Sequence, residues 1–167
     1  MKRNFDFLST LSDFAELYNY CHEAEVNQKS DPKQSALNAR FALEYTVKII
    51  YILHNWVIPK RSSLFELVDN EDFRRFVNDN ELMVALHYIR RAGNNAAHLE
   101  KVTAKESLFS LLNLHSFVSA VLVKLGEVTD VATFNKTLLT ENKGSISKAS
   151  ATFIEPKKRL FINTVNK

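Results

Sequence analysis

The stretch A-R-F-A-L-E-Y-T-V-K-I-I-Y at residues 39–51 decides the fold. Its apolar side chains recur every three or four residues, which is the spacing of one face of an α-helix. Asp31 and Pro32 predict the start of this helix, because an N-cap residue is followed there by proline in the first helical position. Pro59 is expected to end it. Residues 49–53 are apolar almost all round, so we expect this helix to lie at the centre of the molecule.

Helices are predicted on both sides of this segment. One runs from about residue 6 to about 26, and a short one follows Ser63, with a further turn or two near residue 73. Another opens at Asn80, and whether it continues through the Gly-Asn-Asn sequence at 93–95 or ends there stays open. A last helix begins at a capping box, Thr103 with Glu106, and stops near residue 126. The sequence therefore predicts an all-α bundle of four long helices plus one or two short ones.

The composition fits one helical domain and excludes several classes of enzyme. The chain has 167 residues but only 3 Gly and 3 Pro, which disfavours a sheet with many tight turns. Glycines at 93, 126 and 144 cannot spell the usual phosphate-binding loops, which argues against an ATPase or a dinucleotide enzyme within this chain alone. The single Cys21 and the lack of an apolar leader or an 18-residue apolar run predict a soluble cytoplasmic protein without membrane contact.

The charge distribution divides the chain. Residues 1–141 carry a net charge of −2 and residues 142–167 carry +5, which together give the total of +3. We expect a helical bundle over residues 1–129 and a weakly structured linker or tail over 130–167 that leads to a further domain. The basic run at 157–159 is typical of a solvated linker, and the β-type composition at 151–154 and 159–165 has no strand partner nearby.

The most distinctive polar residues lie in L-H-Y-I-R-R-A-G-N-N-A-A-H at 86–98. If the helix continues through the glycine, three of them fall at i, i+4 and i+8 on one face, and the central helix carries a further pair at i, i+4. The interpretation that we favour is a polar network between the two helices that fixes their register. Its predicted members are Arg40, Glu44, Arg90, Asn94 and His98.

Two other interpretations of these residues remain open. In a ribonuclease site, His98 would be the general acid/base and Arg90 or Arg91 the phosphate ligand, with Asn94 beside them. Alternatively, the residues bind a small ligand or a partner protein. No metal site and no cofactor site is predicted, since no His, Cys or carboxylate cluster has ligand spacing. His54 and His115 are expected in the core or at its boundary, and Cys21 is expected to be an inert helix residue.

Aromatic residues beyond those needed for the core are candidate anchors for a partner protein. The candidates are Tyr18, Tyr20, Trp56, Phe73 and Phe76.

The segments 39–51 and 86–98 together resemble the helical domain at the N-terminus of type I restriction enzyme R subunits and of related DEAD/DEAH-type helicase proteins. The resemblance spans about residues 7–125. The positions that agree with the family's pattern are Arg40, Glu44, Arg90, Gly93, Asn94, Ala97 and His98. In such enzymes this domain precedes a PD-(D/E)-x-K nuclease and an ATP-driven translocase, and neither is found in this sequence.

This resemblance implies a non-catalytic docking or regulatory domain of an ATP-dependent, site-specific deoxyribonuclease. ATP and Mg²⁺ are then expected for the parent protein and no cofactor for this chain. The implied partners are other domains or subunits of a restriction-modification complex, and DNA through that complex.

The domain also resembles, more distantly, the HEPN helical bundles, many of which are RNases with an R-x4-6-H motif. Gly93 stands where that motif has its arginine, although Arg91 with His98 satisfies a lax R-x6-H count. A HEPN-type RNase or toxin-like domain using His98 with Arg90 or Arg91, which could act as a homodimer, is therefore an alternative. A stand-alone nucleotide or small-ligand sensor is another.

Overall fold

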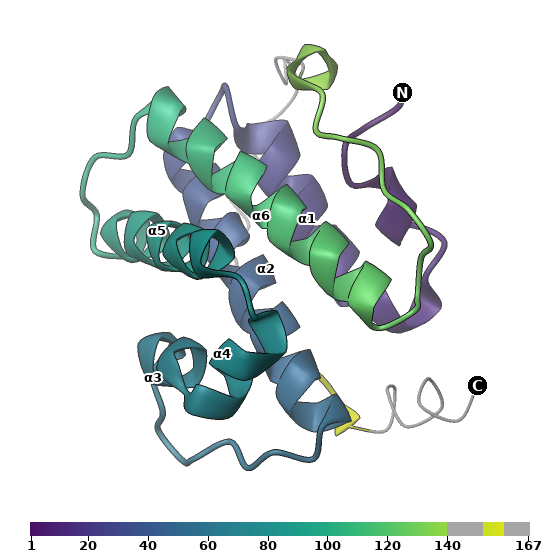
Figure 1. The fold of residues 1–167 in the computed structure, drawn as a ribbon. Helices are drawn as coiled ribbons and strands as arrows, with labels where there is room; N and C mark the ends of the chain where they lie inside the picture. The colour runs from purple at the N-terminus through teal and green to yellow at the C-terminus, as the bar shows by residue number, and fades with distance from the viewer. Residues whose placement is uncertain (140–151, 159–167) are drawn as a thin grey trace.

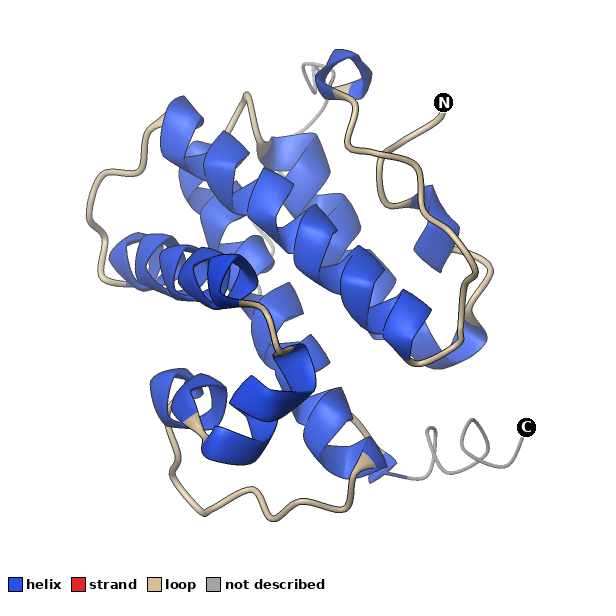
Figure 2. Cartoon of the chain, in the orientation of Figure 1, coloured by secondary structure: helices blue, strands red, loops and turns tan. Residues whose placement is uncertain are grey.

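The computed structural model of the protein describes residues 1–139 and 152–158. Within these ranges the regular structure is helical and no residue lies in a strand, which confirms the predicted all-α bundle (Figure 2). Short 3-10 turns occur at Asp6–Leu8, Ser12–Phe14 and Lys136–Leu138. The helices are α1 (Ala15–Asn27), α2 (Pro32–Leu53), α3 (Leu64–Asp69), α4 (Glu71–Val77), α5 (Asn80–Ala97) and α6 (Ala104–Lys124).

Helix α2 is central, as its sequence predicts. It packs against α1, α5 and α6, and α5 also packs on α6 (Figure 1). The side chains of Leu43, Ile49 and Ile50 are almost completely buried in the core that these helices share. The short helices α3 and α4 lie together near one end of α2, where the Tyr51 hydroxyl donates a hydrogen bond to the carbonyl of Leu67 on α3.

The predicted helix starts are confirmed by side-chain caps. The Asp31 carboxylate accepts a hydrogen bond from the backbone N–H of Gln34 at the start of α2. Ser63 and Thr103 each form a capping box with a glutamate three residues later. Each cap satisfies N–H groups that have no partner within the helix, which is typically worth about 1 kcal/mol.

Three helices end on the same hydrogen-bond pattern, with a left-handed residue just beyond the cap. In α2 this residue is Asn55 (φ 55°), and the N–H of Trp56 donates to the carbonyl of Tyr51 (2.9 Å). This Schellman motif ends α2 at Leu53, so the expectation that the helix continues to Pro59 is wrong. The corresponding left-handed residues are Leu99 after α5 and Gly126 after α6.

The N-terminal helix begins at Ala15 rather than near residue 6. Residues 6–14 instead form two 3-10 turns that bury Leu8 and Phe14. A 3-10 turn repeats every three residues, so its apolar spacing over a few positions resembles that of an α-helix. The sequence pattern therefore identified the buried residues but not the type of helix.

Helix α6 is the one helix in the described residues that is long and apolar enough to cross a membrane, by length and composition alone. Half of its apolar window is buried inside the bundle, where it also places the polar side chains of Ser107, Ser110 and His115. Core helices of soluble proteins meet the same length and composition test.

Part of the predicted tail contacts the bundle. Residues 127–139 run back along the N-terminal segment (Figure 1) and bury Leu139. Residues 152–158 lie against α1 and α2, mostly in irregular backbone, so the β-type composition at 152–154 does not produce a strand. The second β-type stretch, 159–165, lies outside the described residues. The proposed domain boundary at residue 129 stays a prediction.

Candidate functional site

Helix α5 passes through Gly93 without a break, which settles the question that the sequence left open. A Cβ atom at position 93 would lie only 2.3 Å from Cβ of Arg40 on α2, and 2.8 and 2.9 Å from its Cδ and Cγ. Contacts this short are sterically impossible, so the hydrogen of glycine is what allows α2 and α5 to approach here. Gly93 therefore serves helix packing against the aliphatic part of Arg40.

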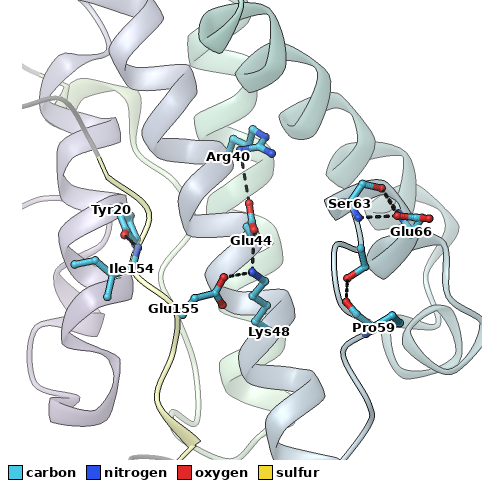
Figure 3. A network of polar contacts seen from close by, with 10 residues as sticks. Tyr20, Arg40, Glu44, Lys48, Pro59, Ser63, Glu66, Ile154 and Glu155 are labelled. Carbon is cyan, nitrogen blue, oxygen red and sulfur yellow. Dashed lines mark hydrogen bonds and ion pairs between the residues drawn. The ribbon is translucent and has the colours of Figure 1, made fainter.

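The α2 half of the predicted network forms a row of charges along one face of the helix (Figure 3). Nη1 of Arg40 lies 3.6 Å from Oε2 of Glu44, and Nζ of Lys48 lies 3.1 Å from Oε1 of the same carboxylate. Lys48 was missed by the sequence analysis, although its i+4 spacing from Glu44 was a signal for it. A second carboxylate, Glu155, lies 2.5 Å from Nζ of Lys48.

The α5 half of the predicted network is not joined to this row by direct contacts. In the part of the chain that the structure describes, no hydrogen bond or ion pair links Arg90, Asn94 or His98 to Arg40 or Glu44. Asn94 is half-buried, and His98 is exposed at the C-cap of α5. Arg91, the alternative phosphate ligand, is exposed.

Arg90 lies over an aromatic ring. Its Cζ atom is 5.2 Å from the ring centroid of Phe65 on α3. The imidazole ring of His87 also contacts Phe65, with the two ring centroids 5.5 Å apart. Burial, followed by the charges of Arg91 and Arg40, lowers the pKa of Arg90. Burial, followed by the charge of Arg90, also lowers the pKa of His87. The middle of α5 therefore has a positive local potential, although residues 1–141 are slightly acidic.

Residues 152–155 form a strap across α1 and α2. The Phe153 ring stacks on Tyr20 with the ring planes 8° apart, and it also contacts Phe41 and the ammonium group of Lys48. The Tyr20 hydroxyl accepts a hydrogen bond from the N–H of Ile154 (2.7 Å, Figure 3) and donates one to the carbonyl of Thr152 (3.2 Å). The rings of Tyr20 and Phe41 and the Lys48–Glu155 ion pair thus hold residues 152–155 against helices that lie more than 100 residues earlier in the sequence.

A second polar junction ties the N-terminal segment to the bundle. The side-chain amide of Asn4 donates to the buried carboxylate of Glu25 (2.8 Å) and to the carbonyl of Asn135 (3.1 Å). His115 is buried nearby between the rings of Phe5 and Phe134, and this burial lowers its pKa. A cavity of about 280 Å³ opens between residues 2–7 and 130–138.

Two of the five aromatic residues expected to anchor a partner are in the core. Tyr20 and Phe73 are buried, so that expectation is wrong for them because their rings fill the interior of the bundle. Tyr18, Trp56 and Phe76 are half-buried and pack on the core. The exposed large apolar side chains in the described residues are Met1, Val57, Phe65, Val84, Leu99, Phe109, Val123 and Ile154.

Neither metal chemistry nor thiol chemistry has a site in the described residues. There, no group of three or more His, Cys, Asp or Glu side chains could hold a metal ion. Cys21 is completely buried, and this burial raises the pKa of its thiol well above the usual value, which disfavours the reactive thiolate.

Comparison with known proteins links the chain to restriction enzymes. Over 97 residues, or 58% of its length, it is 36% identical to the type I restriction enzyme EcoKI endonuclease subunit of Escherichia coli (strain K12). The matched region is only 8% of that much longer subunit. No family model and no solved structure matches the chain. The likeness to HEPN bundles and to helicase proteins stays a prediction.

Proposed function

We propose that this chain is a non-catalytic accessory domain of a type I restriction-modification R subunit, acting in docking or regulation. The observation that carries this proposal is the 36% identity over 97 residues to the EcoKI endonuclease subunit. Because that similarity covers a small fraction of a large subunit, it fits a module attached to a larger enzyme. Exposed apolar side chains on α5 and α6, namely Val84, Phe109 and Val123, also suit docking.

The geometry around His98 supports a non-catalytic role over the RNase alternative. A catalytic histidine is normally oriented by a hydrogen-bond partner, yet His98 is exposed at the C-cap of α5 and its imidazole makes no hydrogen bond among the described residues. At position 93, where the HEPN motif would have arginine, the aliphatic part of Arg40 fills the space that a side chain would need. This favours packing over catalysis at the center of the motif.

The remaining features of the proposal follow from the parent enzyme. Other subunits of the complex are the proposed partners, and DNA is contacted through the assembled enzyme in the cytoplasm. ATP and Mg²⁺ would be used by the motor and nuclease of that enzyme and not by this chain.

A domain replacement tests the proposal. The segment of the EcoKI endonuclease subunit that matches this chain is either deleted or replaced by residues 1–139. We expect deletion to reduce assembly with the other subunits of the enzyme, and replacement to restore it, as measured by light scattering of the purified complex. A deletion that leaves assembly and restriction unchanged, or a soluble, helical replacement that behaves like the deletion, would overturn the proposal.

RNA cleavage tests the alternative directly. The purified chain is incubated with single-stranded RNA, beside its His98→Ala variant. We expect no cleavage above background from either protein. Cleavage that is lost in His98→Ala, while the variant keeps its helical circular dichroism, would establish the RNase interpretation instead.

A further inference from the structure

Two arginines lie at the contact of α2 and α5. The aliphatic part of Arg40 packs on Gly93, and its guanidinium extends toward Glu44, with Nη1 3.6 Å from Oε2. Arg90 lies three residues before Gly93 on α5, on the adjacent turn. The two guanidinium groups are near enough for the charge of Arg40 to lower the pKa of Arg90.

Both guanidinium groups keep their hydrogen-bond donors unused. The Nε atoms of Arg40 and Arg90 are buried without a partner, and neither side chain donates a hydrogen bond within residues 1–139 and 152–158. Buried polar atoms in native proteins almost always have partners, so two such arginines together require an explanation. Arg90 also has no carboxylate at ion-pair distance among the described residues.

The nearest carboxylate does not neutralise the pair. Glu44 lies 3.6 Å from Arg40, which is too long for a hydrogen bond, and it is closer to Lys48 at 3.1 Å. Lys48 is also paired with Glu155 at 2.5 Å, so two carboxylates balance the two cations of α2. Arg90 and Arg91 add positive charge from α5, and among the described residues neither has a carboxylate at ion-pair distance. An anion at the edge of the two helices would offset the repulsion of Arg90 by Arg91 and Arg40, which contributes to the low pKa of Arg90.

The orientation of Arg90 leaves its donors available. Its guanidinium lies over the face of Phe65, which is 47% exposed. Its Nε is buried, but its two terminal Nη groups are not, and these can bind an oxyanion as a pair. Asn94, one turn further along α5, is half-buried and its side-chain amide can supply another donor.

We propose that Arg40 and Arg90 form a binding site for a single phosphate group, held at the edge of the α2–α5 contact. The planar fork of arginine matches the geometry of phosphate oxygens, and partial burial strengthens such contacts compared with those of fully solvated lysines. The site concerns binding alone, and it stands whether or not the chain belongs to a restriction enzyme. Free phosphate and the phosphodiester backbone of DNA present the same chemical group.

Calorimetric titration of the full 167-residue chain tests the site. One set of titrations uses inorganic phosphate and another uses a short DNA duplex at low salt. We expect saturable binding of at least one probe, with an affinity that falls about tenfold or more in Arg90→Gln and in Arg40→Lys, which keeps the charge but loses the fork. Preference for phosphate over duplex, or the reverse, identifies the source of the group.

A matched arginine provides the control for charge. Arg75 on α4 is exposed and already paired with Glu71 and Asp72. Arg75→Gln changes the net charge as Arg90→Gln does, so we expect it to leave binding nearly unchanged. Equal losses in both variants would overturn the proposal, because binding would then follow overall charge, and so would the absence of saturable binding by either probe.

The pKa of His87 gives a second, independent measurement of phosphate binding. Positive neighbours contribute to the low pKa of His87, so a bound phosphate should raise that pKa in the native chain, as followed by NMR of the imidazole. The rise should be absent in Arg90→Gln. A His87 pKa that does not change at saturating probe would place the bound group elsewhere and contradict the site.

Discussion

At the scale of single residues, Gly93 shows how one missing side chain can position a whole helix. The sequence marks this glycine as part of a distinctive motif, and the HEPN comparison treats it as the loss of an arginine. In the structure the aliphatic part of Arg40 fills the space beside Gly93, and a Cβ atom at position 93 would lie 2.3 Å from Cβ of Arg40. Glycine is therefore required by the neighbouring helix, whatever else the motif does.

Replacement of this glycine tests that explanation. Gly93→Ala should destabilise the protein by about 1–3 kcal/mol, because overpacking against Arg40 outweighs the better helix propensity of alanine. Urea denaturation measures the change. Asn95→Ala, on the exposed side of the same turn, should have little effect, and a Gly93→Ala variant that is as stable as Asn95→Ala would show that α2 and α5 are not so close.

The strap depends on another small set of residues. Tyr20→Phe removes two hydrogen bonds to the strap, and Phe153→Ala removes the ring that stacks on Tyr20. The two changes should be coupled by about 0.5–1.5 kcal/mol in a double-mutant cycle measured by denaturation. Strict additivity would mean that residues 152–155 do not rest on α1 in solution.

At the scale of helices, the sequence predicted the capped starts of α2, α3 and α6 better than the end of α2. These starts depend on residues close together in the sequence, such as the cap at Asp31 and the capping boxes at Ser63 and Thr103. The end of α2 was misplaced because proline at 59 is an obvious stop signal, whereas the left-handed conformation of Asn55 depends on hydrogen bonds formed only when the turn closes.

The end of α5 carries backbone strain that a substitution can release. Leu99 adopts φ 62° although its side chain is 83% exposed, while the corresponding position after α6 is Gly126. A left-handed residue other than glycine costs roughly 1–2 kcal/mol, and glycine removes this cost. Part of the gain is offset, because glycine also increases the conformational entropy of the unfolded chain. Leu99→Gly should therefore stabilise the protein by about 0.5–1 kcal/mol.

Thermal or urea denaturation checks this prediction, with Gly126→Ala as the reverse change. Nothing lies within 4 Å of a Cβ at position 126, so its cost should come from the backbone alone. Destabilisation by Leu99→Gly would instead mean that the leucine side chain makes a contact that outweighs the strain.

At the scale of the whole molecule, the sequence predicted the all-α class and the central helix from hydrophobic spacing and from the scarcity of glycine and proline. It placed Arg40 and Glu44 correctly on one face of α2, since i, i+4 geometry is local. It did not foresee Glu155 beside Lys48 or the unpartnered donors of Arg40 and Arg90, because these depend on how distant segments meet.

The buried His115 makes the stability of the whole fold depend on pH. Burial lowers its pKa below the ordinary histidine value of about 6.5, so the unfolded chain binds more protons in this range and stability is lost as pH falls below about 6.5. His87 adds to the effect in the same direction. The free energy of unfolding from urea titrations should therefore decrease between about pH 7 and pH 5, with a shallower slope in His115→Leu. An unchanged slope in that variant would assign the pH dependence to other groups.

DNA cleavage by a chimeric enzyme tests most directly whether this bundle is an accessory domain without catalysis of its own. In the chimera, the matching segment of the EcoKI endonuclease subunit is replaced by residues 1–139 carrying His98→Ala, and cleavage is measured with ATP and Mg²⁺ after assembly with the other subunits. We predict cleavage equal to that of the chimera with His98 intact, and well above that of the subunit lacking the segment. Loss of cleavage on His98→Ala, with assembly and helical content preserved, would contradict the account.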